Sequence, residues 1–285
     1  MEIVTSAAEM QARCLAARTN GQRIAFVPTM GFLHEGHASL LHAGRRRGDL
    51  LVLSIFVNPT QFAPHEDLDR YPRDFARDEA LARAAGVDLI FYPTPDTIYP
   101  PGFATYVNVE GSLAELLEGG CRPGHFRGVA TVVAKLFLIV QPHLALFGQK
   151  DFQQLAIIRR MTTDLNLPVE IVGMPIVREA DGLAMSSRNV YLSADHRRQA
   201  LAISAALALA RLAATNGERA SRKLLLLAEG RLRQEPELQV EYVAVCHQGT
   251  LLETADVDAD TVMLIAARLG ATRLIDNTML LAGSC

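Results

Sequence analysis

Two histidines three residues apart are the first candidates for chemistry in this chain. His34 and His37 flank Gly36, and an apolar stretch over residues 24–27, typical of a strand, precedes them. If a helix starts near Leu33, this spacing places both imidazoles on one face of its first turn. Backbone N–H groups point outward unpaired there and the helix dipole is positive, so such an end binds anions. The pattern predicts a nucleotide site in which two ring donors stabilise a phosphate that gains charge.

Two other interpretations of the histidine pair stay open at this point. A histidine pair can bind zinc, but the run over residues 34–37 lacks the spacing of four found in metalloproteases, and no cysteine lies nearby to complete a tetrahedral set. The pair could also be two exposed histidines on an ordinary helix. The other polar segments favour the nucleotide site.

A lysine at a predicted helix start is the second candidate. Lys150 follows a short predicted strand and Gly148, at a point where the helix dipole disfavours a cation. An anionic ligand would explain this lysine, whereas helix capping alone would explain Asp151. Gln154, one turn further on, faces the same way as Asp151.

Neutral amides and hydroxyls form the third group. Asn58 and Gln61 follow a predicted strand and can both donate and accept, which suits a hydroxyl or one edge of a carboxylate, although Asn-Pro is also a common turn signal. Ser186, Ser187 and Arg188 suit a triphosphate, because arginine forks onto phosphate oxygens and hydroxyls add short hydrogen bonds. A serine-rich linker into the next helix is an equally open interpretation.

A basic segment precedes the helix that is predicted over residues 129–140. Arg122, His125 and Arg127 would meet an anion or an acidic partner there, or they belong to an interface or a lid. The sequence leaves the role of this segment open.

Familiar motifs of other enzyme classes are absent from the sequence. It contains no Gly-x-Ser-x-Gly elbow, no Gly-x-x-x-x-Gly-Lys-Ser/Thr loop and no Gly-x-Gly-x-x-Gly fingerprint, which disfavours α/β-hydrolases, P-loop ATPases and dinucleotide dehydrogenases. Paired histidines, a lysine and a Ser/Arg segment together indicate attack on an α-phosphate with pyrophosphate as the leaving group. Positioning and charge stabilisation would supply most of the catalysis.

Composition narrows the class of protein. The 285 residues carry a formal charge of −3, so no basic stripe indicates nucleic-acid binding. The four cysteines, Cys14, Cys121, Cys246 and Cys285, form no Cys-x-x-Cys pair, which argues against a zinc or redox site. No signal peptide and no membrane span are expected, because the most apolar stretch, residues 200–214, is too short. A cytoplasmic protein is the expectation.

The first part of the chain alternates between strands and helices that would hold these groups. Strands are expected over residues 23–27, 50–57, 87–92, 143–147 and 169–174. Helices are expected over residues 34–47, 74–85, 129–140 and 151–165. Continuous apolar runs are typical of strands buried on both faces, so the alternation predicts an α/β fold with a parallel sheet between helices. Such sheets bind ligands at the carboxyl ends of their strands.

The pattern changes near Ile176, where a domain boundary is expected. Ser193 is a candidate N-cap for a long helix. That helix would reach residue 214, a second would span residues 220–233, and strands would follow over residues 239–246, 262–267 and 272–278. This order predicts a domain over residues 1–176 and a smaller α+β domain with an antiparallel sheet over residues 177–285.

Five segments resemble the signatures of the pantothenate synthetase (pantoate–β-alanine ligase) family. They occur in the family's order over nearly the whole chain, at residues 28–37, 56–62, 122–128, 147–154 and 185–189. The resemblance implies a Rossmann-like nucleotidyltransferase domain and a smaller carboxyl-terminal domain that covers the site. It also implies the activity, in which the carboxylate of (R)-pantoate attacks the α-phosphorus of ATP and the amine of β-alanine then attacks pantoyl adenylate. Pantothenate, AMP and pyrophosphate result; Mg²⁺ and a homodimer are expected.

The resemblance also implies roles for the matching residues. The ATP contacts would be Met30, Gly31, Phe32, Leu33, His34, Glu35, Gly36, His37, Gly148, Gln149, Lys150, Asp151, Val177, Met185, Ser186, Ser187 and Arg188. The catalytic set would comprise His34, His37, Lys150 and Arg188, with His37 as the proton donor. Asp151 would meet the ribose, and the backbone of Val177 would lie near the adenine.

The acceptor pocket follows from the same resemblance. Gln61 and Gln154 would hold pantoate, Gln61 would also border β-alanine, and Asn58 is grouped with them. Side-chain ligands of Mg²⁺ are not indicated. At Gln149 the family more often has glutamate, a departure that would tune the charge beside Lys150.

Two rival functions compete with this activity. Another nucleotidyltransferase would act on a phosphate acceptor and would need more cations in its acceptor pocket than Asn58, Gln61 and Gln154 provide. A nucleotide-sensing module would bind ATP without turnover, but binding alone seldom needs two histidines, a lysine and an arginine together.

Overall fold

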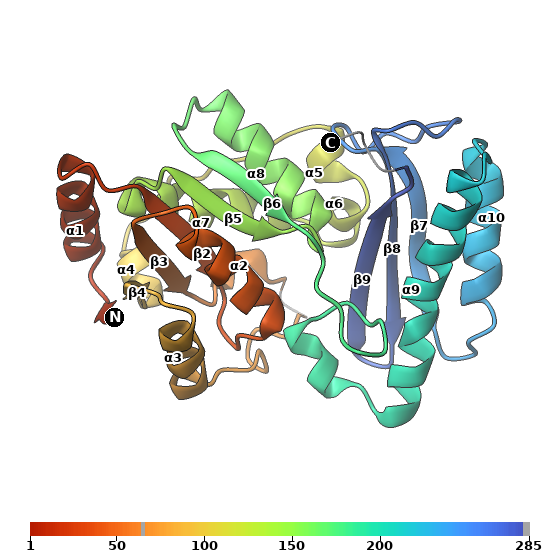
Figure 1. Ribbon diagram of the computed structural model, residues 1–285, viewed down its shortest axis with the longest axis horizontal. Helices are drawn as coiled ribbons and strands as arrows, with labels where there is room; N and C mark the ends of the chain where they lie inside the picture. Colours follow the sequence, from red (N-terminus) through yellow and green to blue (C-terminus); the bar gives the residue numbers. More distant parts are fainter. Residues whose placement is uncertain (64–65, 282–285) are drawn as a thin grey trace. The chain divides into compact units, whose positions relative to one another are not determined.

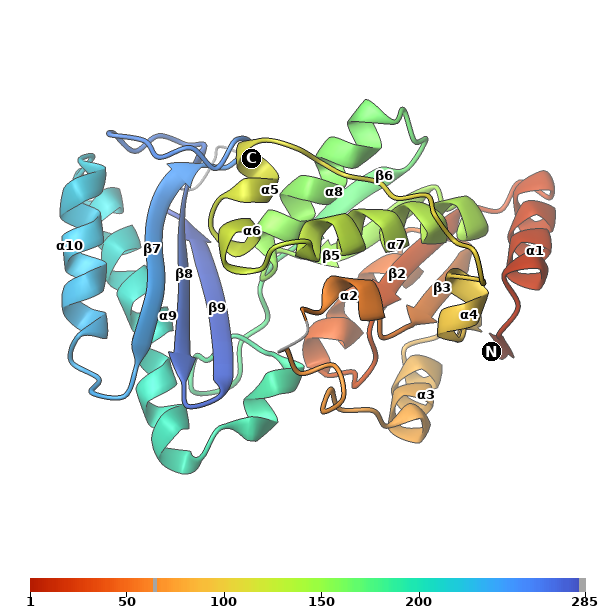
Figure 2. The same cartoon turned by 180° about the vertical axis from the view of Figure 1, so that it is seen from behind.

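A computed structural model describes residues 1–63 and 66–281 of the chain (Figures 1 and 2). The chain forms two compact units, which are described separately below. The first contains residues 1–149 and 154–175, and the second contains residues 150–153 together with the chain from Ile176 onward. The short segment Lys150–Gln153 therefore clusters with the second unit, although its neighbours in sequence belong to the first.

A six-stranded sheet forms the centre of the first unit. Its strands are β1 Glu2–Val4, β2 Ile24–Thr29, β3 Leu50–Ile55, β4 Leu89–Phe91, β5 Leu144–Gly148 and β6 Glu170–Met174. They pair in the order β1-β4-β3-β2-β5-β6, and every pair is parallel. The parallel sheet expected from the buried apolar runs is confirmed.

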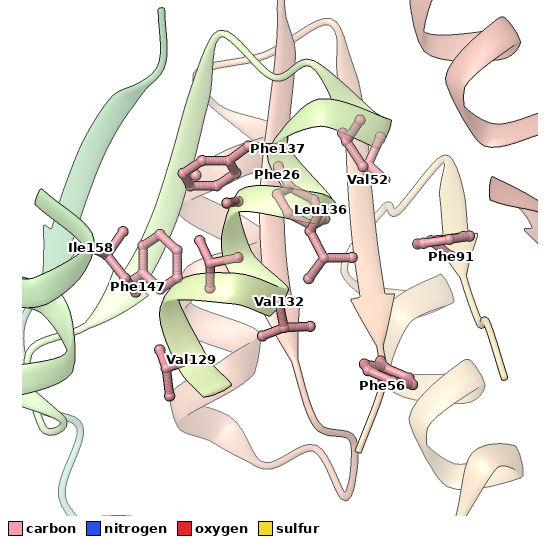
Figure 3. Packing of buried hydrophobic residues seen from close by; sticks show 14 of the residues in the cluster. Phe26, Val52, Phe56, Phe91, Val129, Val132, Leu136, Phe137, Phe147 and Ile158 are labelled. Carbon is pink, nitrogen blue, oxygen red and sulfur yellow. The ribbon is translucent and has the colours of Figure 1, made fainter. Parts of the chain in front are cut away.

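Helices cover both faces of this sheet (Figure 1). Side chains of α1 Ala7–Thr19, α7 His125–Val140 and α8 Phe152–Asp164 share one core with Ile24 and Phe26. Side chains of α2 Glu35–Arg45 and α3 Phe75–Ala84 share another with Ala25 and Val27, because successive strand residues point to opposite faces. Figure 3 shows the first core, in which Phe137 of α7 lies edge-on to both Phe26 and Phe147.

Short helical turns connect the longer elements of the first unit. They are η1 Pro59–Gln61, α4 Pro95–Ile98, α5 Ser112–Glu115 and α6 Glu118–Cys121. Of these, η1 carries Gln61 and follows β3 at its carboxyl end.

The second unit is built on an antiparallel sheet, as predicted. Strands β7 Gln239–His247, β8 Thr261–Leu269 and β9 Thr272–Met279 pair in that order, and α9 Ala194–Thr215 and α10 Ser221–Leu232 pack on them. Ser193 caps α9 by accepting from the N–H of His196. The turn η2 Ser187–Tyr191 precedes α9. In the described ranges no helix is both long and apolar enough to cross a membrane.

Three features differ from the sequence expectations. The edge strand β1 and helix α1 were not predicted, although Ser6 accepts from the N–H of Glu9 as an N-cap. Helix α7 begins at His125 instead of residue 129, because Gly124 adopts φ 82° and starts the helix ahead of its apolar part.

Among the described cysteines, Cys14, Cys121 and Cys246 are free thiols, while Cys285 lies outside the described residues.

Candidate functional site

The strand order of the first unit locates the candidate site. From β2 the chain proceeds through β3 to β4 on one side, and β5 lies on the other side of β2. The sheet therefore has a topological switch point between β2 and β5, and parallel sheets bind ligands outside the carboxyl ends of the strands at such a point. Met30 follows β2, Asn58 follows β3 and Gln149 follows β5, so three predicted segments meet at this edge.

A buried carboxylate shapes the turn after β2. Gly31 and Phe32 both have positive φ, at 84° and 49°. Asp78 of α3 accepts the N–H groups of Phe32 at 2.8 Å and Leu33 at 2.6 Å, and its own side chain is buried. A Cβ on Gly31 would lie 2.9 Å from an Asp78 oxygen, so the turn also requires glycine. Sequence analysis missed Asp78, because it was one acidic residue in a predicted helix.

The two histidines cap the helix that carries them. His34 is the N-cap of α2, and its Nδ1 accepts from the N–H of Gly36 at 3.1 Å. The Nδ1 of His37 accepts from the N–H of His34 at 3.2 Å, and the two ring centroids lie 4.1 Å apart. The imidazoles therefore occupy the N–H groups of His34 and Gly36, which the sequence analysis expected to be open to a ligand.

This capping arrangement fixes which ring nitrogens carry protons. A backbone N–H can only donate, so each Nδ1 must present a lone pair and each neutral ring must carry its proton on Nε2. His34 and His37 are thereby prepared as Nε2–H donors. An anion at this helix start would be bound by the two rings.

The turn after β3 presents Gln61. The amide Nδ2 of Asn58 donates to Gln61 Oε1 at 3.1 Å and to the carbonyl of Gly128 at 3.2 Å. Asn58 Oδ1 accepts from the hydroxyls of Tyr99 and Thr60. Both ends of the buried Asn58 amide are thus bonded within the protein. The structure assigns Asn58 to holding Gln61, which differs from the direct substrate contact that the sequence suggested.

The Gln61 side chain makes two hydrogen bonds of different strength. Its Nε2 donates to the sulfur of Met30 at 3.1 Å, while its Oε1 takes the strong bond from Asn58. Because a thioether is a weak acceptor, a substrate oxygen can compete for the Gln61 N–H.

Lys150 stands in the turn between β5 and α8 and clusters with the second unit. Its side chain is 20 % exposed, and its Nζ lies 3.9 Å from an oxygen of Asp151. Its carbonyl accepts from Nδ2 of Asn277 on β9 at 3.0 Å. The lysine main chain is therefore fixed independently of its ammonium group.

The predicted Ser/Arg segment follows a hairpin of the second unit. Residues 177–185 fold back on themselves, with a bridge between Arg178 and Ala184 and a bond from the Met185 N–H to the Val177 carbonyl. Ser186 then caps η2 by accepting from the N–H of Arg188 at 3.3 Å. This Ser186 oxygen has a structural role, and its own O–H can still donate to a phosphate.

Ion pairs brace this hairpin within the second unit. Arg178 forks onto both oxygens of the buried Asp276, with distances of 2.6 and 3.0 Å. Arg197 of α9 pairs with Glu179, which also accepts from Asn189. Asp276 and Asn277 are neighbours on β9, so one strand supports both the hairpin and the Lys150 turn.

Mg²⁺ would need few protein side chains as ligands at this site. The part of the chain that the structure describes contains no group of three or more histidine, cysteine, aspartate or glutamate side chains that could hold a metal ion. Mg²⁺ in such enzymes commonly uses substrate phosphates and water as ligands, with one or two carboxylates. This donor set would be compatible with a metal that arrives bound to a nucleoside triphosphate.

Comparison with known proteins identifies the family. The profile of the pantoate-beta-alanine ligase family matches residues 2–279. The chain belongs to this family. It is 61% identical to the pantothenate synthetase of Syntrophotalea carbinolica, over 99% of both chains, and 55% identical to that of Geotalea uraniireducens, over 98% of this chain and 99% of the relative.

Solved structures of ligases agree with the fold. The crystal structure of pantothenate synthetase from Thermus thermophilus superimposes with a TM-score of 0.94 at 49% identity and covers 98% of this chain and 99% of its own. The pantoate-beta-alanine ligase of Francisella tularensis, crystallised with beta-gamma ATP and beta-alanine, gives 0.81 at 30% identity over 99% of each chain. This chain is an enzyme of the same kind, with a Rossmann-like sheet unit and a smaller antiparallel unit.

The candidate residues of this ligase divide between the two units. The first unit holds Met30, Gly31, Phe32, Leu33, His34, Glu35, Gly36, His37, Asn58, Gln61, Gly148, Gln149 and Gln154. The second unit holds Lys150, Asp151, Val177, Met185, Ser186, Ser187 and Arg188.

Acid should destabilise this ligase partly through His125. Burial and the neighbouring Arg122 lower the pKa of His125 from 6.5 to about 4. Between these two pKa values the His125 side chain is protonated in the unfolded chain and neutral in the folded chain. This group alone should therefore lower the free energy of unfolding by about 2 kcal/mol between about pH 7 and about pH 4.5. Urea unfolding at both values checks this. The H125N variant should show the smaller decrease; equal decreases would contradict it.

Proposed function

We propose that this ligase condenses (R)-pantoate with β-alanine through a pantoyl-adenylate intermediate and releases AMP and pyrophosphate. The observation that carries the proposal is the histidine pair at the switch point, whose hydrogen bonds make both Nε2 atoms N–H donors suited to a phosphate. Family membership supports the overall reaction, and the Francisella relative crystallised with beta-gamma ATP and beta-alanine supports the two ligands.

In the first step a pantoate carboxylate oxygen forms a bond to the α-phosphorus of ATP. The bond from that phosphorus to the bridging oxygen breaks, and pyrophosphate leaves. Two anions must approach each other, so the reaction needs positive charge and donors that are strongest where charge develops. We assign this work to Lys150, Arg188 and the Nε2–H groups of His34 and His37.

In the second step the β-alanine nitrogen attacks the acyl carbon of the adenylate. β-Alanine attacks as the neutral amine, the new C–N bond replaces the C–O bond to AMP, and the nitrogen gives up one proton to solvent water. His37, as proton donor, stabilises the departing phosphate oxygen through its Nε2–H. In the first step, Mg²⁺ bound to the triphosphate would neutralise charge at the phosphate oxygens.

The remaining residues bind and orient in this proposal. The residues named above as ATP contacts bind the nucleotide, with Asp151 at the ribose and the Val177 backbone near the adenine. Gln61 and Gln154 hold pantoate, and Asn58 acts through Gln61. The proposal keeps a catalytic domain over residues 1–176 and a smaller domain over residues 177–285, although residues 150–153 and Ile176 cluster with the second unit. The enzyme works in the cytoplasm as a homodimer. Light scattering of the purified enzyme would test its oligomeric state.

Release of pyrophosphate separates this function from its rivals. With ATP, Mg²⁺ and pantoate but no β-alanine, the enzyme should release pyrophosphate in an amount close to that of its sites. A nucleotide-sensing module would release none, and a transferase specific for phosphate acceptors would release none with pantoate. Either result would refute the proposal.

Removal of the Gln61 amide should weaken pantoate binding alone. In Q61A the KM for pantoate should rise roughly tenfold or more, because a hydrogen bond to a charged or hydroxyl group of the substrate is lost. The Kd for ATP should stay within about twofold, since Gln61 bonds to none of the proposed phosphate-binding side chains and reaches the proposed ATP contacts only through a weak bond to the Met30 sulfur. The exposed Gln22→Ala variant is the control. A parallel loss of ATP affinity would show that the acceptor pocket is misplaced.

A further inference from the structure

The proposed reaction leaves the basic residues Arg122, His125 and Arg127 at the start of α7 without a role, although this segment lies against the Gln61 turn. A Cβ on Gly128 would lie 2.3 Å from the carbonyl oxygen of Thr60 and 2.7 Å from the nitrogen of Gln61. Only glycine permits this approach of the helix to η1. The first turn of α7 is therefore a support for the residue that binds pantoate.

His125 bonds directly to the main chain of Gln61. Its Nδ1 lies 2.8 Å from the Gln61 carbonyl oxygen, and its Nε2 lies 3.0 Å from Nη1 of Arg122. The carbonyl can only accept and the guanidinium can only donate, so Nδ1 carries the proton and Nε2 accepts. This tautomer is the opposite of the one assigned to His34 and His37.

Arg122 is fixed in turn by Glu66. The guanidinium donates to both carboxylate oxygens of Glu66, at 2.6 and 2.8 Å, and both side chains are largely buried. Burial raises the pKa of the Glu66 carboxyl, but the hydrogen bonds and charge of Arg122 lower it further, so the pair is ionised at neutral pH. The anion or acidic partner that the sequence expected for Arg122 is this glutamate of the same chain.

The surroundings favour a neutral ring at His125. Arg122 disfavours its protonation, and Glu66 and Glu118 favour it. His125 is itself buried, and a second proton on the ring would remove the acceptor that Arg122 uses. The neutral ring therefore accepts from Arg122 through Nε2 and donates the shorter bond to the Gln61 carbonyl, to which Nη2 of Arg122 also donates at 3.4 Å.

We infer that His125 is a positioning residue for pantoate: oriented by the Glu66–Arg122 pair, its Nδ1–H holds the Gln61 carbonyl and thereby aims the Gln61 amide. The inference rests on the proposed role of Gln61. It adds three linked side chains that act only through Gln61, namely Glu66, Arg122 and His125. These three side chains contact no phosphate-binding residue named above. Loss of their hydrogen bonds should therefore weaken the binding of pantoate and leave the binding of ATP unchanged.

Two substitutions of His125 separate positioning from mere packing. Asparagine places an amide N–H where Nδ1–H stands, so H125N keeps the bond to Gln61. Glutamine carries its amide to the position of Nε2, so H125Q keeps the contact with Arg122 and loses that bond. We expect the pantoate KM of H125Q to rise about tenfold and that of H125N by less than about threefold, with ATP affinity unchanged in both.

A spectroscopic readout tests the hydrogen bond without turnover. Nitrogen-15 NMR of the whole histidine-labelled enzyme at neutral pH should show His125 with its proton on Nδ1, identified by the loss of its signals in H125N. A proton on Nε2 would overturn the inference, as would equal rises in the pantoate and ATP constants of H125Q. If the wild-type enzyme releases no pyrophosphate from ATP and pantoate, the proposed function fails, and the tautomer still decides whether His125 holds Gln61.

Discussion

Replacement of Lys150 by alanine should lower the rate of adenylate formation by about 100- to 1,000-fold. The expected loss is large because charge on the transferring phosphoryl group peaks in the transition state, where a nearby ammonium group stabilises it most. The Kd for ATP should change by less than about tenfold, because the same contact is weaker in the ground state. A single-turnover measurement of pyrophosphate release, together with equilibrium binding of ATP, checks both numbers.

The structure indicates that removal of the Lys150 side chain should not disturb the local backbone. The Lys150 main chain is held by Asn277, so truncation of the side chain leaves the turn in place. Lys223, a well-exposed lysine paired with Glu218 in the second unit, is the matched control, and Lys223→Ala should retain the wild-type rate. Loss of rate and of ATP affinity by the same factor would contradict a role for Lys150 in the transition state.

Asp78→Asn should reduce stability and ATP affinity together. The two N–H groups of Phe32 and Leu33 both require an acceptor, and an amide offers only one while turning an N–H₂ toward the other. A buried donor left without a partner costs about 1–3 kcal/mol. The strained turn at Gly31 and Phe32 depends on those bonds, so the start of α2 should also lose its geometry. Urea unfolding and ATP titration measure the two effects.

A neighbouring residue provides the control for Asp78. Asp74 is the N-cap of α3, and its side chain accepts the N–H of Arg77 at 3.1 Å. Asparagine caps helices about as well as aspartate, so Asp74→Asn should be nearly neutral. If Asp78→Asn unfolds at the same urea concentration as the wild type and binds ATP equally well, Asp78 does not support the histidine turn.

Elements with a strong local pattern could be predicted from the sequence. The apolar run of β3 and the Ser193 cap of α9 required no tertiary information, since burial on both faces and capping leave direct traces in the residues. The edge strand β1 spans only three residues, too few to show a period. Helix α1 has its buried Met10, Cys14 and Ala17 at helical spacing, so its signal was present and was overlooked.

The supports of the site could not be predicted, because they act across long sequence separations. Asp78 and the turn after β2 are 45 or more residues apart, and His125 and Gln61 are 64 residues apart. Nothing local distinguishes Asp78 from a solvated helix residue. Asn58 was given a substrate contact for the same reason: its polar character was visible in the sequence, but its partners Tyr99 and Gly128 were not.

The clustering of Lys150–Gln153 with the second unit was equally hidden. In the sequence this segment is a turn between a strand and a helix, and such turns are ordinarily assigned to the sheet they connect. The bond from Asn277 to the Lys150 carbonyl accounts for the difference, because it ties the turn to β9.

Transfer of oxygen-18 from pantoate is the most direct measurement of the adenylation mechanism. With both carboxylate oxygens labelled, attack on the α-phosphorus and later cleavage of the acyl C–O bond must leave one labelled oxygen in AMP and one in pantothenate. Mass spectrometry of the products after turnover with ATP and β-alanine should find that distribution. Unlabelled AMP, or ADP with labelled phosphate, would show that the carboxylate attacks elsewhere and would contradict the proposed function.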